Sequence, residues 1–307
     1  MKHNIKAIQN HHLSCHQLLL ATYASYQNRS SEMICADGWG FIYERNYNIF
    51  GESLYPGYQN RRAILFKKFH GIQLHEKIYT SHEILVEELQ SNLPCSPLIL
   101  RCDVFDCPWN ISYHKYSIPH CVLIIGIEEN AEQLYILDPY STINTNMINM
   151  SAIAPNNGYF ATFTTLPFVE PKIEDYHAEI INSLNYIVNS KLFDNLDSFY
   201  SDLHNRFEEV IQQKYTDIYA IPLILKLNQI ANQRYSYCTF LNILHENKLV
   251  DLSLLELMNS IADEYSLYRK LLIKQIMRRK VEYDQVEKFY TIIKKEHDAY
   301  ELMKSFA

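Results

Sequence analysis

The sequence predicts an α+β fold, with a mixed first part followed by an all-α second part. All seven glycines lie between Gly38 and Gly158, and nine of the ten prolines lie between Pro56 and Pro171. Glycine and proline mark turns and sheet corners, so their loss after Pro171 indicates a change of architecture. We therefore predict two domains, 1–168 and 169–307.

Composition limits the function classes. The chain has 307 residues, of which 48% are hydrophobic, enough to bury a substantial core. Its net charge of −7 argues against a nucleic-acid-binding protein, which would usually have a basic domain. No apolar run approaches the roughly 18 residues of a membrane span, and the N-terminus lacks the apolar stretch of a secretion signal. We expect a cytoplasmic protein whose seven cysteines are thiols.

Two helices are predicted in the first part. Residues 14–27 carry apolar side chains at helical spacing, with Ser14 as N-cap, so Cys15 falls on the first turn. Residues 81–92 form the second helix, with Ser81 as N-cap. Between these helices, residues 41–43 indicate a short strand.

The strands of the first part follow in close order. Apolar runs predict strands at 97–103, 120–127, 134–138 and 159–165. The second and third of these are separated by a charged turn at 128–133, which favours an antiparallel hairpin. Helices followed by an antiparallel sheet are typical of the α+β class.

The second part reads as helices with little interruption. Apolar residues recur at spacings of three and four, predicting helices at 175–190, 194–214, 217–232, 234–247, 252–279 and 282–304. Because the apolar faces are broad and heptads are not strict, we expect a packed bundle rather than a coiled coil.

Three residues form a candidate catalytic set. A thiol on the first helical turn is a better nucleophile, because free backbone N–H groups stabilise its thiolate. Cys15 has this position. His120 begins one arm of the predicted hairpin and Asp138 ends the other, so folding brings them near each other. A histidine and a carboxylate at one thiol are the parts of a cysteine nucleophile system. Whether they share a face depends on a register that the sequence does not show.

Gln9 is a fourth candidate. It lies six residues before Cys15, where papain-like enzymes place the glutamine that stabilises the oxyanion. The order glutamine, cysteine on a helix, histidine on a strand and aspartate after a strand is the papain-like order.

Structural roles for the same residues remain open. A cysteine near a helix start is often buried and inert, His120 could be a core histidine, and Asp138 could serve the turn before Pro139. A zinc cluster of Cys95, Cys102, Cys107, His114 and Cys121 is disfavoured because no C-x-x-C pair is present. We expect no metal and no cofactor.

At these residues the chain resembles a known family. Residues 97–103, 108–110 and 113–115, and the run 120–126 from His120 to Gly126, resemble the N-terminal domain of the butirosin-biosynthesis protein H family. That family has a papain-like fold related to the C39-type cysteine peptidases. The resemblance covers about residues 9–165 and implies Cys15 as nucleophile, with His120 and Asp138. The chain departs from the family at Ser14, where histidine is common.

The resemblance also implies a reaction. Such an enzyme moves an acyl group from a carrier-protein thioester to an amine in natural-product biosynthesis. A cysteine peptidase or a thioesterase would use the same three residues, and a non-catalytic carrier-protein-binding module would keep the fold. We expect an acyl or peptidyl carrier protein and a small amine as partners, and neither nucleic acid nor membrane. Lys270, Lys274 and Arg278 share one helix face, which is either a solvated face or a docking surface for an acidic carrier.

Overall fold

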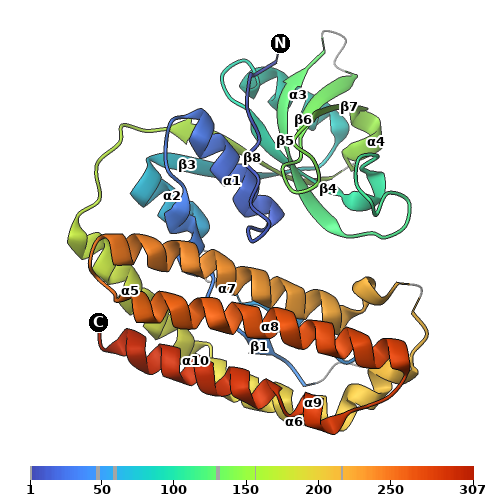
Figure 1. Cartoon of the computed structure of the whole chain (residues 1–307). Coiled ribbons are helices and arrows are strands. Elements are labelled where there is room, and N and C mark those ends of the chain that lie inside the picture. The colour runs from blue at the N-terminus through green and yellow to red at the C-terminus, as the bar shows by residue number, and fades with distance from the viewer. Residues whose placement is uncertain (1, 46–48, 58–60, 129–131, 156, 216) are drawn as a thin grey trace. The chain divides into compact units, whose positions relative to one another are not determined.

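The computed structural model describes residues 2–45, 49–57, 61–128, 132–155, 157–215 and 217–307. Contacts divide the chain into two compact units (Figure 1). The first comprises Met1–Ile34 and Ala63–Glu170, and the second comprises Cys35–Arg62 and Pro171–Ala307. No helix in the described ranges is long and apolar enough to cross a membrane.

The first unit is built on a six-stranded sheet in which every neighbouring pair is antiparallel. The strands are ordered β3-β8-β4-β5-β6-β7. Their bounds are β3 (Ile72–Tyr79), β4 (Leu98–Asp103), β5 (Pro119–Ile127), β6 (Gln133–Leu137), β7 (Thr145–Asn149) and β8 (Gly158–Thr165). The sheet is therefore of the antiparallel type that the sequence predicts.

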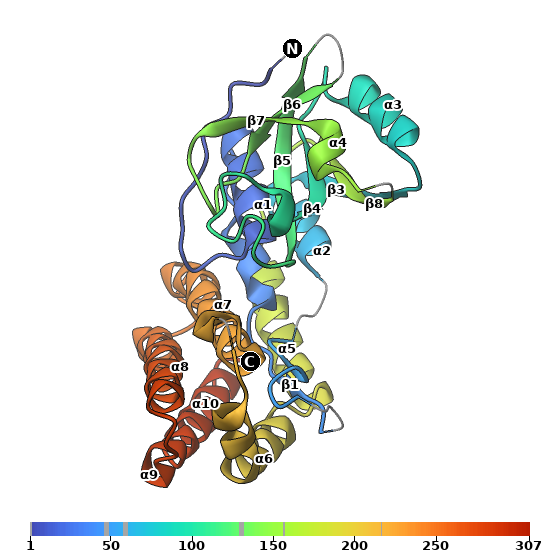
Figure 2. The ribbon, with the colours of Figure 1, turned by 90° about the vertical axis from the view of Figure 1, so that its right-hand side faces the viewer.

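Helices cover both faces of this sheet. On one face lies α1 (Cys15–Tyr26), where the Tyr23 ring stacks on Phe163 of β8 at 3.8 Å between centroids. The other face carries α3 (His82–Asn92) and the short α4 (Met150–Ile153), and Leu85 and Leu89 of α3 join the core beneath β4 and β5 (Figures 1 and 2). The strand alternation thus has one apolar layer facing α1 and another facing α3.

Most elements predicted in the first part are found close to their expected bounds. Ser14 and Ser81 are the N-caps of α1 and α3, and the four predicted strands are β4, β5, β6 and β8. The turn predicted at 128–133 includes residues 129–131, which lie outside the described residues. Sequence reasoning missed α2 (Arg62–His70), β3 and β7. β3 is an edge strand whose exposed Glu76 and Lys77 interrupt the apolar alternation, as is common at sheet edges.

The second unit is rich in helices, with α5 (Ile173–Asn189), α6 (Leu192–Gln212), α7 (Pro222–Glu246), α8 (Leu252–Arg278), α9 (Tyr283–Val286) and α10 (Phe289–Lys304). The helices predicted at 217–232 and 234–247 are wrong as separate elements, because α7 runs through both. Pro222 occupies the first turn of α7, where a backbone N–H would have no hydrogen-bond partner within the helix, so its absence in proline costs nothing. No glycine or other proline follows within α7. The helix predicted at 282–304 is instead interrupted between α9 and α10.

Residues 35–62 group with the helical unit, which differs from the predicted 1–168 domain. This segment carries β1 (Ile42–Tyr43) and β2 (Leu54–Tyr55). Trp39 donates its indole N–H to Oε2 of Glu296 at 2.6 Å, and the Glu296 Oε1 atom accepts from Arg234 Nε at 2.8 Å. Arg234 also donates to the carbonyls of Gly38 and Gly40, both at 3.1 Å. A buried ion pair between distant helices thus holds the loop, a contact that no local pattern reveals.

Removal of the Glu296 carboxylate should destabilise the helical unit strongly. Glu296→Ala leaves the buried guanidinium of Arg234 without a carboxylate to balance its charge, which typically costs about 3–5 kcal/mol. Urea unfolding followed by far-ultraviolet circular dichroism measures this loss. Glu301→Ala, which removes an exposed partner of Lys304 on the same helix, should leave the midpoint almost unchanged. Equal midpoints for the two variants would contradict a structural role for the buried pair.

Candidate active site

Cys15 is the first residue of α1, and the local sequence explains why the helix starts there. The Ser14 hydroxyl accepts the N–H of Gln17 at 3.3 Å, and Oε1 of Gln17 accepts the N–H of Ser14 at 3.0 Å. This capping box satisfies two N–H groups at the helix end. Ser14, the departure from the family pattern, therefore has a clear role as N-cap. The Cys15 side chain is half-buried at the positive end of the helix.

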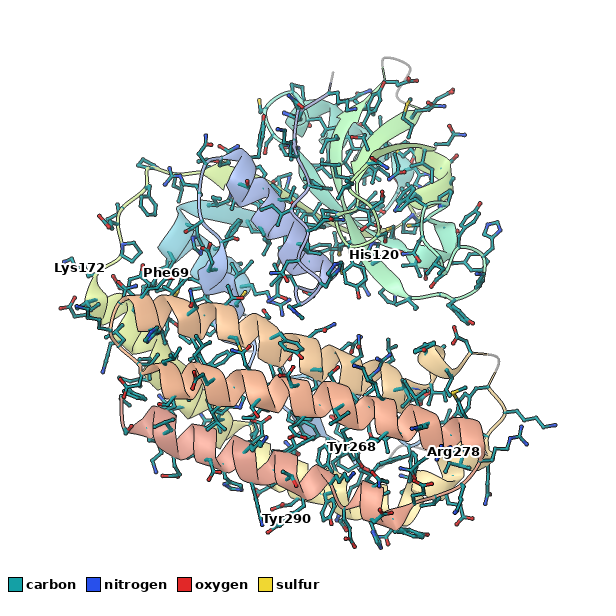
Figure 3. The ribbon with its side chains drawn as sticks, in the orientation of Figure 1. Phe69, His120, Lys172, Tyr268, Arg278 and Tyr290 are labelled. Carbon is teal, nitrogen blue, oxygen red and sulfur yellow. The ribbon has the colours of Figure 1, made fainter. Side chains whose placement is uncertain are left out.

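His120 lies near the start of β5 and is buried (labelled in Figure 3). Its ring lies beside the side chain of Cys15, and the two interact electrostatically. On its other side, Nε2 lies 2.9 Å from Oδ2 of Asp138. The ring N–H does not point directly at that oxygen, so the contact is an ion pair by distance rather than a well-aligned hydrogen bond. One ring therefore contacts both the thiol and the carboxylate.

A β-bulge decides that Asp138 and His120 share a face. At the turn end of the hairpin, Ile127 pairs with Leu134 and Gly126 with Tyr135. Continued without interruption, that register would set Asp138 opposite Leu123, on the face opposite to His120. The register shifts between Ile124 and Gly126, and Leu123 then pairs with Leu137. Asp138 accordingly follows onto the face of Val122 and His120.

Asp138 is fully buried just after β6, and neighbouring groups hold it in place. The indole N–H of Trp109 donates to Oδ2 at 2.8 Å. The backbone N–H of Ser141 donates to Oδ1 at 3.3 Å. The side-chain amide of Asn110 donates to the Ser141 hydroxyl at 2.9 Å, so the loop that carries Trp109 is tied to the turn after Asp138. Burial raises the pKa of the Asp138 carboxyl, but hydrogen bonds and the charge of His120 outweigh it, so the pKa is lowered.

The site favours a charged thiolate–imidazolium pair. Burial alone would raise the pKa of the Cys15 thiol, but the hydrogen bond and charge of His120 and the N–H groups of Cys121 and His16 together lower the pKa. Burial opposes charge on His120 as well, yet its contacts with Asp138 and Cys15 raise the pKa of the ring to about 10. Between these two pKa values the thiolate is the main form of Cys15. A thiolate with an adjacent imidazolium can attack an electrophilic carbonyl and protonate the leaving group.

Sequence reasoning thus named three residues that the fold brings together, Cys15, His120 and Asp138. The fourth, Gln9, is exposed in the irregular segment before α1, and within the described ranges no hydrogen bond joins it to Cys15. The oxyanion role predicted for Gln9 concerns a contact with bound substrate, so it stays a prediction. The backbone N–H of Cys121 instead contacts the Cys15 sulfur. A main-chain donor leaves no mark in a sequence.

Two aromatic residues of the site also escaped prediction. Trp109 fixes Asp138, and the Tyr140 ring lies 6.0 Å from the ring of His120. Tyr140 is half-exposed beside the reacting groups, with its pKa raised by burial and by the nearby charge of Cys15. The available signals were weak, since Trp109 is one of only two tryptophans and Tyr140 follows the Asp138-Pro139 pair.

The other cysteines differ from Cys15. Cys35, Cys102, Cys107 and Cys238 are buried and Cys95 is exposed. The Cys102 and Cys107 sulfur atoms lie 3.8 Å apart, and their interaction together with burial raises the pKa of Cys102. Burial raises the pKa of Cys121 and of Cys238 to about 12. In the part of the chain that is described, no group of three candidate ligands could hold a metal ion.

Comparison with models of known protein families gives no match, and comparison with curated proteins gives none either. The family resemblance therefore stays a prediction from residues 9–165.

Cys15 should be alkylated by iodoacetamide much faster than Cys95, which serves as an exposed internal control. An ordinary thiol with a pKa of about 8.5 is only about 1% thiolate at pH 6.5, whereas the lowered pKa of Cys15 gives it a larger thiolate fraction at that pH. We expect a rate ratio of about ten or more at pH 6.5, measured by peptide mapping, and a smaller ratio at pH 9. His120→Ala should abolish the difference at pH 6.5. Equal rates for Cys15 and Cys95 at pH 6.5 would refute the ion pair.

Proposed function

We propose that this chain is a cysteine-dependent acyltransferase with a papain-like first unit, which moves an acyl group from a carrier-protein thioester to an amine. The observation that carries the proposal is the joined set of Cys15, His120 and Asp138, with the thiol at a helix N-terminus. The choice of acyl transfer among the reactions open to this set rests on the resemblance to the butirosin-biosynthesis protein H family.

In the first half of the reaction, the Cys15 thiolate attacks the thioester carbonyl. The bond between that carbon and the carrier sulfur breaks, and His120 gives its proton to the departing carrier thiolate. The acyl group is then joined to Cys15 as a new thioester. The N–H of Cys121 already contacts the Cys15 sulfur, so it is a candidate donor to the developing charge.

In the second half, neutral His120 removes a proton from the incoming amine while the amine nitrogen attacks the acyl carbon. The bond to the Cys15 sulfur breaks, the amide leaves, and the thiolate–imidazolium pair is restored. Asp138 contributes by orienting the ring and by stabilising its charge throughout. Atoms and protons balance over the two halves of the reaction.

The proposed partner is an acidic carrier protein, and α8 offers a surface of suitable charge. Lys270, Lys274 and Arg278 are all exposed at a spacing of four residues, beside the exposed side chains of Leu267 and Met277. Arg278 lies at the C-terminal end of α8 and pairs with Glu282 at 3.5 Å (labelled in Figure 3). Arg269 is not part of this surface, because its Nε donates to the carbonyl of Ile224. Complementary charge of this kind raises association rates.

Mixing the protein with an acyl-loaded carrier protein should produce a covalent adduct on Cys15. Intact-mass spectrometry should show the mass of the acyl group on the wild type and on Cys95→Ala, and no adduct on Cys15→Ala. Added amine should discharge the adduct at least about ten times faster than water, since an acyltransferase must limit hydrolysis.

Several outcomes would contradict transfer to an amine. Rapid discharge by water alone would indicate a thioesterase, and peptide cleavage without an adduct would indicate a peptidase. A carrier that binds with no reaction would indicate a non-catalytic binding module.

The Lys270→Glu/Lys274→Glu variant should slow acylation by the carrier but not by a small thioester, with Lys288→Glu/Lys294→Glu as the matched control.

A further inference from the structure

An open cleft of ≈ 740 Å³ lies at the end of the sheet where β3 and β4 finish and where β5 and β8 begin. Its lining includes Ile78, Arg101, Asp103, Pro119, Ala154 and Tyr159. The cleft does not include Cys15, but Pro119 immediately precedes His120, so it adjoins the candidate active site. No step of the proposed reaction assigns it a role.

Strand register connects the cleft to the nucleophile. Arg101 of β4 lies directly opposite Cys121 of β5, and the N–H of Cys121 contacts the Cys15 sulfur. Neighbouring strands are about 5 Å apart, so the backbone of Arg101 lies roughly one strand spacing from that of Cys121, the residue next to the Cys15 sulfur. The charge of Arg101 acts on the Cys121 thiol, consistent with this short separation. Ile78 and Tyr159 are paired farther along the same face.

This part of the sheet face is open. Ile78 is 79% exposed although it points to the face that α1 covers elsewhere, and Arg101 is exposed as well. Tyr159 is only partly buried, and its hydroxyl donates to Glu76 Oε1 at 2.8 Å. A ligand that reaches Cys15 along this face would therefore meet an apolar side chain, a phenol and a guanidinium.

The charge of Arg101 is not neutralised by an ion pair within the described part of the chain. Of the carboxylates nearby, Asp103 accepts the N–H groups of Phe105 and Ile118 and the hydroxyl of Ser117. Asp106 also lines the cleft, but it forms no ion pair with Arg101. The guanidinium fork is thus available for a carboxylate, the group it binds best with two parallel hydrogen bonds.

The side of the sheet indicates which part of a substrate Arg101 would meet. His120 must contact both the departing thiol and the entering amine, so these lie on its side of Cys15. Arg101 belongs to the alternate face, because its partner Cys121 is the neighbour of His120 in β5. The acyl chain, which needs no contact with the histidine, is the part left to extend toward Arg101.

We propose that Arg101 binds a carboxylate carried by the acyl group, so that the preferred donors are acyl thioesters with a free carboxylate a few bonds beyond the reacting carbonyl. The inference rests on the proposed function for the acyl group, but the anion site beside Cys15 can be tested independently of it.

Alkylation with a matched pair of reagents tests the anion site. N-iodoacetylglycine carries a carboxylate and N-iodoacetylglycinamide does not, while both react with thiolates. The quantity measured is the ratio of the Cys15 alkylation rates for the anionic and the neutral reagent. This ratio should be about five-fold or more higher in the wild type than in Arg101→Gln, the size expected for one partly solvated ion pair. Arg101→Lys should keep part of the preference. Lys77→Gln, which removes a cation from the opposite face of β3, should behave as the wild type.

The controls separate the possible failures. Equal iodoacetamide rates for the wild type and Arg101→Gln show that the nucleophile is intact, and an unchanged reagent ratio in Arg101→Gln would overturn the anion site.

Glutaryl and butyryl thioesters then test the donor class. Preferential acylation by the glutaryl donor, lost in Arg101→Gln, supports the proposal, whereas equal acylation overturns it. If neither donor acylates Cys15, the proposed function and the acyl assignment fail, while the reagent ratio still decides the anion site.

Discussion

The β-bulge between Ile124 and Gly126 is the constraint on which the candidate site depends. A strand has a side-chain period of two, so one extra residue in β5 exchanges the faces on which later residues of its partner lie. With that residue, Asp138 reaches the face of His120, and without it a regular hairpin carrying the same side chains would turn the carboxylate away. The ion pair at 2.9 Å is the result. Bulges are common beside active sites for this reason.

Burial gives the assembled groups their chemical character. Burial disfavours charge on all three groups. The contacts of Cys15 and of Asp138 with His120 outweigh it at those two residues, and His120 is held charged by both of them. The helix end adds N–H groups at Cys15, and Trp109 and Ser141 add donors at Asp138. Loss of His120 would leave the Cys15 thiolate and the Asp138 carboxylate without the positive charge that they share. The three groups are therefore expected to act as a unit, with effects on reactivity that do not add.

Local sequence patterns predicted the parts of the site but not its assembly. The Ser14 N-cap placed Cys15 on a first turn, and the apolar runs placed His120 and Asp138 at strand ends. Gly126 lies at the bulge, and a glycine inside a strand is a signal of one, but the apolar run around it shows no register. The contact of Trp109 with Asp138 spans 29 residues. Residues 35–62 group with the helical unit and not with the predicted first domain for the same reason, since the partner of Trp39 is 257 residues away. Gln9 was chosen by its spacing from Cys15 and by the chain order, it is exposed, and its oxyanion role stays a prediction.

The protonation state of the His120 ring tests the central claim most directly. Nitrogen-15 NMR of the labelled imidazole reports whether the ring is charged, and His120→Gln identifies its signals. The account predicts a ring that stays protonated at pH 8 and titrates near its raised pKa of about 10. Cys15→Ser and Asp138→Asn should each lower that pKa, because each removes a negative partner. A His120 ring that titrates near 6.5 in the wild type, unchanged in both variants, would contradict the charged thiolate–imidazolium pair.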